Sequence, residues 1–271
     1  MTIKDLLVVV DASEQGRERL RLGMGLAQRF GARITAYYMS PTVGTYRPEP
    51  TTGAFSRDRE RSFAELAESL EVSFAEEARR RGLEGRWLLS SEHAGPDIAS
   101  HARATDIVVL GLGDPDAATD AQGFAVEDVV LACGRPVLGL PIVRLPEAVG
   151  RSVLVAWDGS REASRAMHDA MPLLAAAEAV TVLTVDARGL KGPTGDSAAA
   201  HLRRHGVKAE AKETVSGALE IGMAVLSYAE HIDADLVVAG AYGHSRLSET
   251  LLGGVSRTLL HQMMIPVLMS H

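Results

Sequence analysis

The chain has 271 residues, of which 46% are hydrophobic, enough for one large or two ordinary folded domains. Its formal net charge of −7 leaves no basic excess to bind a phosphate backbone or an anionic membrane, so neither nucleic acid nor membrane is expected as a partner. The single cysteine, Cys133, excludes an intramolecular disulfide, and no apolar run approaches the roughly 18 residues of a membrane span, so we expect a cytoplasmic protein.

Short apolar runs alternate with longer amphipathic stretches along the first half. The first run, LLVVV at 6–10, is continuous and β-branched, as a strand buried on both faces should be. The same reasoning predicts strands at 32–39, 86–92, 105–111 and 135–143, and helices at 15–31, 58–82, 96–104 and 125–134. In the long charged helix, the apolar spacing of Phe63, Leu66, Leu70 and Phe74 predicts the face toward the core.

The second half repeats this pattern. KDLLVVVDASEQGRERL near the N-terminus aligns with RSVLVAWDGSREASRAM at 151–167, which places Asp11 over Asp158 and Ser13 over Ser160. TDIVVLGLG aligns with ADLVVAGAYG, and GRPVL with MIPVL. We therefore predict two domains, 1–143 and 150–271, joined by LPEAVG, each an α/β fold with a doubly wound, five-stranded parallel sheet.

In the second half we expect five strands, at 152–157, 179–186, 207–215, 234–240 and 266–270, and four helices, at 160–176, 197–205, 217–231 and 254–263. Ligands of such sheets bind at the carboxyl ends of the strands, where the strand order reverses. Asp158 follows the first strand and Gly240 ends the fourth, so both should line that crevice. The alternative is that Asp158 only caps the next helix together with Ser160, since both are ordinary capping residues.

The segment GAYGHSRLSETLLGGVSRTLL at 240–260 has the composition of a phosphate loop. Gly240 and Gly243 let the backbone approach a ligand, and Gly253 and Gly254 open a helix whose free N–H groups favour an anion. Hydroxyl and guanidinium donors accompany them, from Ser245, Ser256 and Arg246. His244 lies in the same turn, as a candidate phosphate contact or an exposed tip.

The spacing of Gly240, two residues, Gly243, nine residues, then Gly253-Gly254-Val255-Ser256 resembles the nucleotide-binding signature of the universal stress proteins. The resemblance covers both halves, so the chain looks like a tandem member with the Rossmann-like, adenine nucleotide alpha hydrolase-like fold. It implies that adenine binds near Ala156, Asp158 and Val185, and the phosphates near Gly240, Gly243, Gly253, Gly254, Val255 and Ser256. Arg246 is added as a phosphate contact from its charge.

One position departs from that signature. Family members that bind ATP usually carry Ser or Thr where Gly254 stands here. The backbone N–H survives this change, but one hydroxyl donor is lost, a hydrogen bond worth about 0.5 to 1.5 kcal/mol, or roughly a factor of two to ten in affinity. We expect weakened rather than abolished binding of ATP, ADP or AMP, with Mg²⁺ as an optional companion ion.

The first half departs much further. Its loop after Gly111 reads LGDPDAATDAQGFAVED, so carboxylates occupy the phosphate turn, and Phe124 and Val126 replace Gly254 and Ser256. Because carboxylates repel phosphate, we expect no nucleotide of this kind in the first half. The carboxylates of that turn are Asp114, Asp116 and Asp120.

Three alternatives stay open. An ATP-using enzyme of a related fold would need a glycine-rich loop after the first strand, which DGSREAS lacks, and weak ATP hydrolysis is the residual possibility. His201 and His205, spaced i, i+4, could share a metal, but no third ligand is near in sequence, so no metal is expected.

A nucleotide-free interaction module is the third alternative. By the resemblance, RPVLGLP and IPVLMS would pair within one chain and hide a sheet edge, and a homodimer stays open.

The resemblance implies a role in stress response and signalling. The stress, the downstream partner and the role of the loop at 42–56 have no signal in the sequence.

Overall fold

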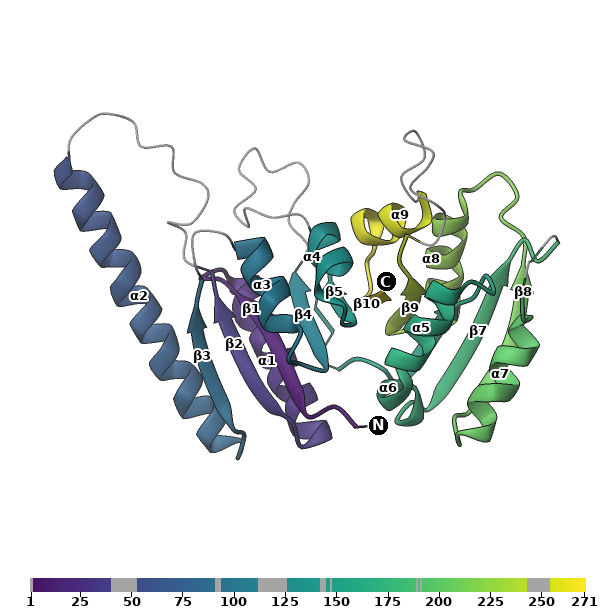
Figure 1. The fold of residues 1–271 in the computed structure, drawn as a ribbon, viewed down its shortest axis with the longest axis horizontal. Coiled ribbons are helices and arrows are strands. Elements are labelled where there is room, and N and C mark those ends of the chain that lie inside the picture. Colours follow the sequence, from purple (N-terminus) through teal and green to yellow (C-terminus); the bar gives the residue numbers. More distant parts are fainter. Residues whose placement is uncertain are drawn as a thin grey trace. The chain divides into compact units, whose positions relative to one another are not determined.

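A computed structural model describes most of the chain in two compact units (Figure 1). The N-terminal unit is formed by Ile3–Cys133 and the C-terminal unit by Gly134–His271. The residues that the structure describes are 2–39, 53–90, 94–111, 126–141, 145–146, 148–188, 190, 192–242 and 254–271. Each unit is treated by itself below.

In the N-terminal unit four parallel strands lie in the order β3-β2-β1-β4. The chain moves outward from β1 to β3 and then returns to the other side of β1, which makes the sheet doubly wound. The elements are β1 (Asp5–Val10), α1 (Glu14–Phe30), β2 (Arg33–Tyr38), α2 (Gly53–Arg80), β3 (Gly85–Leu89), α3 (Ala94–Ala102), β4 (Ile107–Gly111) and α4 (Val126–Cys133).

The C-terminal unit repeats this arrangement as β10-β9-β6-β7-β8, with parallel neighbours. Beside β10 (Val267–Ser270) lies β5 (Val137–Leu140), the one antiparallel neighbour among these described strands. The other elements are β6 (Ser152–Ala156), α5 (Arg161–Asp169), α6 (Met171–Ala175), β7 (Ala179–Val185), α7 (Gly195–Arg204), β8 (Ala209–Thr214), α8 (Ile221–His231), β9 (Leu236–Gly240) and α9 (Gly254–Gln262). The predicted α/β class with doubly wound parallel sheets is confirmed.

The compact units do not divide the chain where the sequence repeat does. The repeat predicts domains 1–143 and 150–271, whereas β5 lies with the C-terminal unit. The reason is its pairing with β10, in which Leu138 is opposite Leu268 and Val137 opposite Met269. The segments RPVLGLP and IPVLMS thus lie side by side, although the pairing of the two predicted domains as whole bodies stays a prediction.

The central strands carry the cores. Residues Leu6–Val10 of β1 and Leu236–Ala239 of β9 are buried throughout, as their continuous apolar runs predict. Cys133 is buried at the end of α4.

Helix bounds differ from the predictions by a few residues, as in α8, which begins at Ile221 rather than 217, and two differences are larger. The predicted helix at 160–176 is divided into α5 and α6 at Ala170, because Pro172 lacks an N–H group and its ring crowds the preceding turn. Helix α2, the dark blue helix beside β3 in Figure 1, begins at Gly53 rather than 58. Of its predicted core face, Phe74 is buried, Leu66 and Leu70 are half-buried, and the side chain of Phe63 lies outside the described residues.

Candidate nucleotide site

The strand order reverses between β6 and β9 in the C-terminal unit. Asp158 lies two residues beyond the end of β6, and Gly240 is the last residue of β9. The topology therefore brings together the loops that follow these two strands, at the edge of the sheet where doubly wound folds bind ligands.

Asp158 uses one of its carboxylate oxygens to shape the start of α5. Its Oδ1 accepts a hydrogen bond of 2.9 Å from the backbone N–H of Ser160, and Ser160 Oγ in turn accepts from Ala163 N–H at 3.1 Å. Ser160 is thus the N-cap of α5, and the capping role that was the alternative for this pair is present. The Asp158 side chain is exposed, and among the residues that the structure describes its Oδ2 has no partner.

The predicted adenine neighbours lie around this carboxylate on adjacent strands. Ala156 ends β6 and Val185 ends β7, both half-buried, and β6 pairs directly with β7. The loop after β7 packs against the same place, because Trp157 Nε1 donates to Pro193 O at 2.8 Å. Trp157 is itself buried, so it serves the core rather than the ligand.

Helix α9 begins at Gly254, as the glycine pair predicts. A Cβ at exposed Gly254 would meet no atom within 4 Å, so the surroundings do not explain why this residue is glycine. Ser256 is buried, and its Oγ accepts a 3.1 Å hydrogen bond from the backbone N–H of Tyr242. The backbone of Tyr242 is in the left-handed region, with a φ of +56°. Ser256 therefore holds the turn after β9, and Val255 lies half-buried beside it.

The role of Gly240 in the structure is packing. A Cβ on this residue would lie 2.5 Å from Ala163 N and 2.9 Å from Glu162 Cβ, in the first turn of α5. The absence of a side chain at Gly240 lets α5 approach the end of β9. Its contact with a ligand stays a prediction.

Several predicted site residues lie outside the described part of the chain. Of the phosphate contacts these are Gly243, Arg246 and Gly253, together with the nearby His244 and Ser245. In the first half they are Asp114, Asp116, Asp120 and Phe124. Most of the 42–56 loop lies outside it too.

In the N-terminal unit the corresponding crevice contains a side chain of the chain itself. Asp11 Oδ1 accepts from Ser13 N–H at 2.8 Å, as its counterpart does, but Asp11 Oδ2 pairs with Arg19 Nη2 at 3.0 Å. The Arg19 side chain is only 4% exposed, and a Cβ at Gly111, the end of β4, would lie 2.6 Å from its Cζ. The guanidinium thus fills the space between the ends of β1 and β4.

Arg19 was missed by reasoning from the sequence, although a signal for it exists. Arg19 lies on the same buried face of α1 as Leu22 and Leu26. A charged side chain buried on such a face is stable only beside an oppositely charged group, so its position alone indicates an ion pair. Burial lowers the pKa of Arg19 and the Asp11 carboxylate counteracts this shift. The aligned residue of the second half is Ala166, which is also buried but has no charge.

The structure brings a third histidine to the pair on α7. The rings of His168 and His205 lie 5.2 Å and 4.7 Å from that of His201. Burial, with the neighbouring His205 and His168, lowers the pKa of His201. Even so, no group of three or more His, Cys, Asp or Glu side chains in the described ranges is arranged to hold a metal ion.

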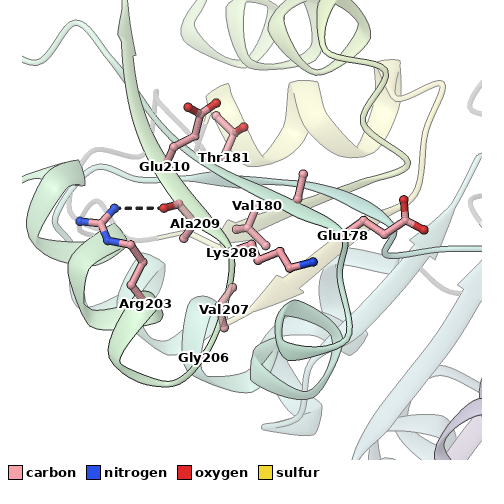
Figure 2. Close-up of a pocket in the computed structure, with 10 residues that line it drawn as sticks. Glu178, Val180, Thr181, Arg203, Gly206, Val207, Lys208, Ala209 and Glu210 are labelled. Atoms are coloured by element: carbon pink, nitrogen blue, oxygen red, sulfur yellow. Dashed lines mark hydrogen bonds between the residues drawn. The ribbon is translucent and has the colours of Figure 1, made fainter.

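The C-terminal unit also has a cavity of about 520 Å³ at the opposite end of its strands (Figure 2). It lies at the amino ends of β7 and β8, where Arg203 Nη1 donates to Ala209 O at 3.0 Å. Its walls carry both acidic and basic residues, among them Glu178, Lys208 and Glu210. Because Asp158 and α9 lie at the carboxyl edge, this cavity is separate from the predicted site.

A family model for universal stress proteins matches residues 150–271. Residues 150–271 are a universal stress protein domain. The resemblance inferred from the glycine motif is thereby confirmed for the half that contains the motif.

Solved structures extend the likeness to the fold of the whole chain. A universal stress protein from Archaeoglobus fulgidus DSM 4304 has a TM-score of 0.75 at 16% identity, covering 98% of this chain and 95% of its own. A functionally unknown protein from Pseudomonas aeruginosa PAO1 has a TM-score of 0.62 at 14% identity, covering 99% and 92%. At these identities the likeness establishes fold only. No curated protein matches the chain in sequence.

The helices of the described residues include none that is long and apolar enough to cross a membrane. The universal stress protein domain thus contains the carboxylate after β6 and the helix start after β9, both at one edge of its sheet.

Proposed function

We propose that the universal stress protein domain at 150–271 binds one adenine nucleotide, and that the N-terminal unit binds none. ATP is the expected nucleotide, with ADP, AMP and a cyclic nucleotide as alternatives and Mg²⁺ as a companion of the triphosphate. The binding serves stress sensing and signalling rather than metabolic catalysis, and slow ATP hydrolysis is at most a side reaction.

The observation that carries the proposal is the different state of two aligned carboxylates. In both aspartates Oδ1 accepts a hydrogen bond from the backbone N–H of the serine that begins the following helix. Arg19 occupies Oδ2 of Asp11, whereas Asp158 is exposed with Oδ2 directed to no described partner. The second carboxylate therefore has an oxygen ready to accept a hydrogen bond from an adenine amino group or a ribose hydroxyl, whereas the first already shares that oxygen with a buried guanidinium.

The start of α9 is the natural place for the phosphates. The first N–H groups of a helix have no partner within it, and the helix dipole adds a partial positive charge. Val255 and Ser256 are in the first turn of α9, and exposed Gly254 leaves its approach open. We expect Gly240, Gly243, Gly253 and Arg246 to complete the phosphate site.

A nucleotide-free interaction module is the second candidate. It is favoured by the antiparallel pairing of β5 with β10, which covers a sheet edge that would otherwise present unpaired backbone groups. That pairing does not account for the exposed carboxylate at Asp158, so we rank nucleotide binding first.

Titration of ATP into the full chain and into Asp158→Asn tests the proposal. The amide keeps an oxygen for Ser160 N–H and puts an NH₂ donor where Oδ2 stands, so it cannot accept from the ligand. A hydrogen bond to a charged group is worth about 1.5 to 3 kcal/mol, so we expect ATP affinity to fall by about ten- to a hundredfold.

The matched control is Asp11→Asn, which makes the same change in the other half. It should leave ATP affinity unchanged. Equal affinity of wild type and Asp158→Asn, or loss of binding in Asp11→Asn alone, would rule out the assignment of the site to the second half.

A further inference from the structure

The N-terminal unit contains a cavity of about 520 Å³ that the nucleotide proposal does not use. It lies between α1, the C-terminal half of α2 and the ends of β1, β2 and β3. Its walls are partly apolar, formed by Leu20 and Met24 of α1, Leu66, Leu70 and Phe74 of α2, and Trp87 of β3, with polar and charged side chains between them. Cavities of this size and character are typical of sites for small organic molecules.

Two polar groups on the lining lack hydrogen-bond partners among the described residues. The rings of Tyr38 and Trp87 stack with centroids 5.4 Å apart, and Tyr38 is fully buried. Neither Tyr38 Oη nor Trp87 Nε1 has a partner within the part of the chain that the structure describes, although both atoms are buried. Buried polar groups are nearly always satisfied in folded proteins. An acceptor oxygen on a bound molecule would satisfy either donor.

Tyr38 keeps its proton in this environment. Burial raises the pKa of the phenol, and the nearby Asp11 carboxylate raises it further. The hydroxyl is therefore available as a donor at neutral pH.

The charges around the cavity favour an anion. Its two acidic residues are each paired already, Asp11 with Arg19 and Glu77 with Arg80 and Arg81. Arg17 and Arg21 are exposed on α1 at the cavity, and neither forms a close ion pair with any described residue, although Arg21 adds to Arg81 and Arg80 in lowering the pKa of Glu77. Both guanidinium groups can still contact an acidic group at the edge of the cavity.

We propose that this cavity binds a small amphipathic acid, whose apolar body packs among Leu20, Leu70 and Phe74 and whose acidic group accepts from Tyr38 or Trp87. Arg17 and Arg21 at the edge of the cavity attract its charge. The site is independent of the nucleotide site, because it is formed entirely by the N-terminal unit.

Calorimetric titration of the full chain with decanoate tests this proposal, with 1-decanol as the uncharged probe of equal chain length. We expect one decanoate per chain, and weaker binding of decanol by about two- to fivefold, the value of an exposed charge interaction. Tyr38→Phe should weaken decanoate binding by about two- to tenfold, because it removes one hydrogen bond and keeps the ring.

Leu70→Trp fills the cavity and should reduce decanoate affinity at least tenfold. Its matched control is Val72→Trp on the same helix, where the side chain is 53% exposed and does not line the cavity; binding should be unchanged. Thermal unfolding shows whether each variant is folded. If Leu70→Trp does not fold, Tyr38→Phe tests the site in its place. No decanoate binding, or equal binding by wild type and folded Leu70→Trp, would overturn the site. Equal affinity for decanol would overturn the acidic class of ligand.

Discussion

At the scale of single residues, the two halves differ most at the aspartate that follows the first strand. The repeat in the sequence aligns Asp11 with Asp158 and predicts that both begin a helix together with a serine. It does not predict that Arg19 reaches Asp11 Oδ2, because that contact depends on how α1 packs over the end of β4. Under the proposed function, the buried arginine would exclude a nucleotide from the N-terminal unit, in addition to the carboxylates that follow Gly111 in the sequence.

Arg19→Met tests how much this ion pair contributes to the stability of the N-terminal unit. The change leaves the Asp11 carboxylate, 29% exposed, without its partner, so we expect the N-terminal unit to lose about 1 to 3 kcal/mol of stability. Urea unfolding followed by Trp87 fluorescence in a Trp157→Phe background reports on this unit alone. The double variant Arg19→Met, Asp11→Asn should lose less than the two single losses combined. Strict additivity would mean that the pair contributes nothing.

Gly240→Ala tests the packing role of the glycine at the end of β9. Its Cβ would lie 2.5 Å from Ala163 N, which cannot move without shifting α5, so we expect a loss of about 1 to 3 kcal/mol. Urea unfolding followed by Trp157 fluorescence in a Trp87→Phe background measures it. Gly254→Ala is the control, since its Cβ meets nothing within 4 Å and the unfolding midpoint should hardly change. Equal midpoints for the two variants would contradict the packing role.

At the scale of elements, strand positions and order could be predicted well, because buried parallel strands are continuous apolar runs and doubly wound sheets have few possible orders. Helix ends were less certain, as the division at Ala170 and the start of α2 show. The half-buried Leu66 and Leu70 also fit the periodicity of a core face, yet they line a cavity. Periodicity shows which way a residue points and not whether its neighbours fill the space.

The start of α9 allows a gain-of-affinity prediction. Gly254→Ser adds a hydroxyl donor where the space is open, so ATP affinity should rise by about two- to tenfold, the value of one hydrogen bond. Gly254→Ala adds the same Cβ without the hydroxyl and should give no gain. Isothermal titration of both variants measures the difference. An equal gain in both would point to helix stabilisation instead of a phosphate contact.

At the scale of the whole molecule, the duplication could be read from the sequence, whereas the assignment of β5 could not. GRPVL belongs to the first repeat by alignment, yet β5 pairs with β10 at the end of the second. Strand pairing between distant segments depends on tertiary contacts that alignment of the repeats does not encode. The result is a chain whose two halves share one fold and differ at the aspartate after the first strand, which is paired with a buried arginine in one half and exposed in the other.

Native mass spectrometry of the intact chain, incubated with an equimolar mixture of ATP, ADP, AMP and cyclic AMP, tests the central claim most directly. The mass difference gives both the number and the identity of the bound nucleotides. The account predicts one nucleotide per chain, with ATP foremost, and its loss in Asp158→Asn but not in Asp11→Asn. Two nucleotides per chain, or none, would contradict it.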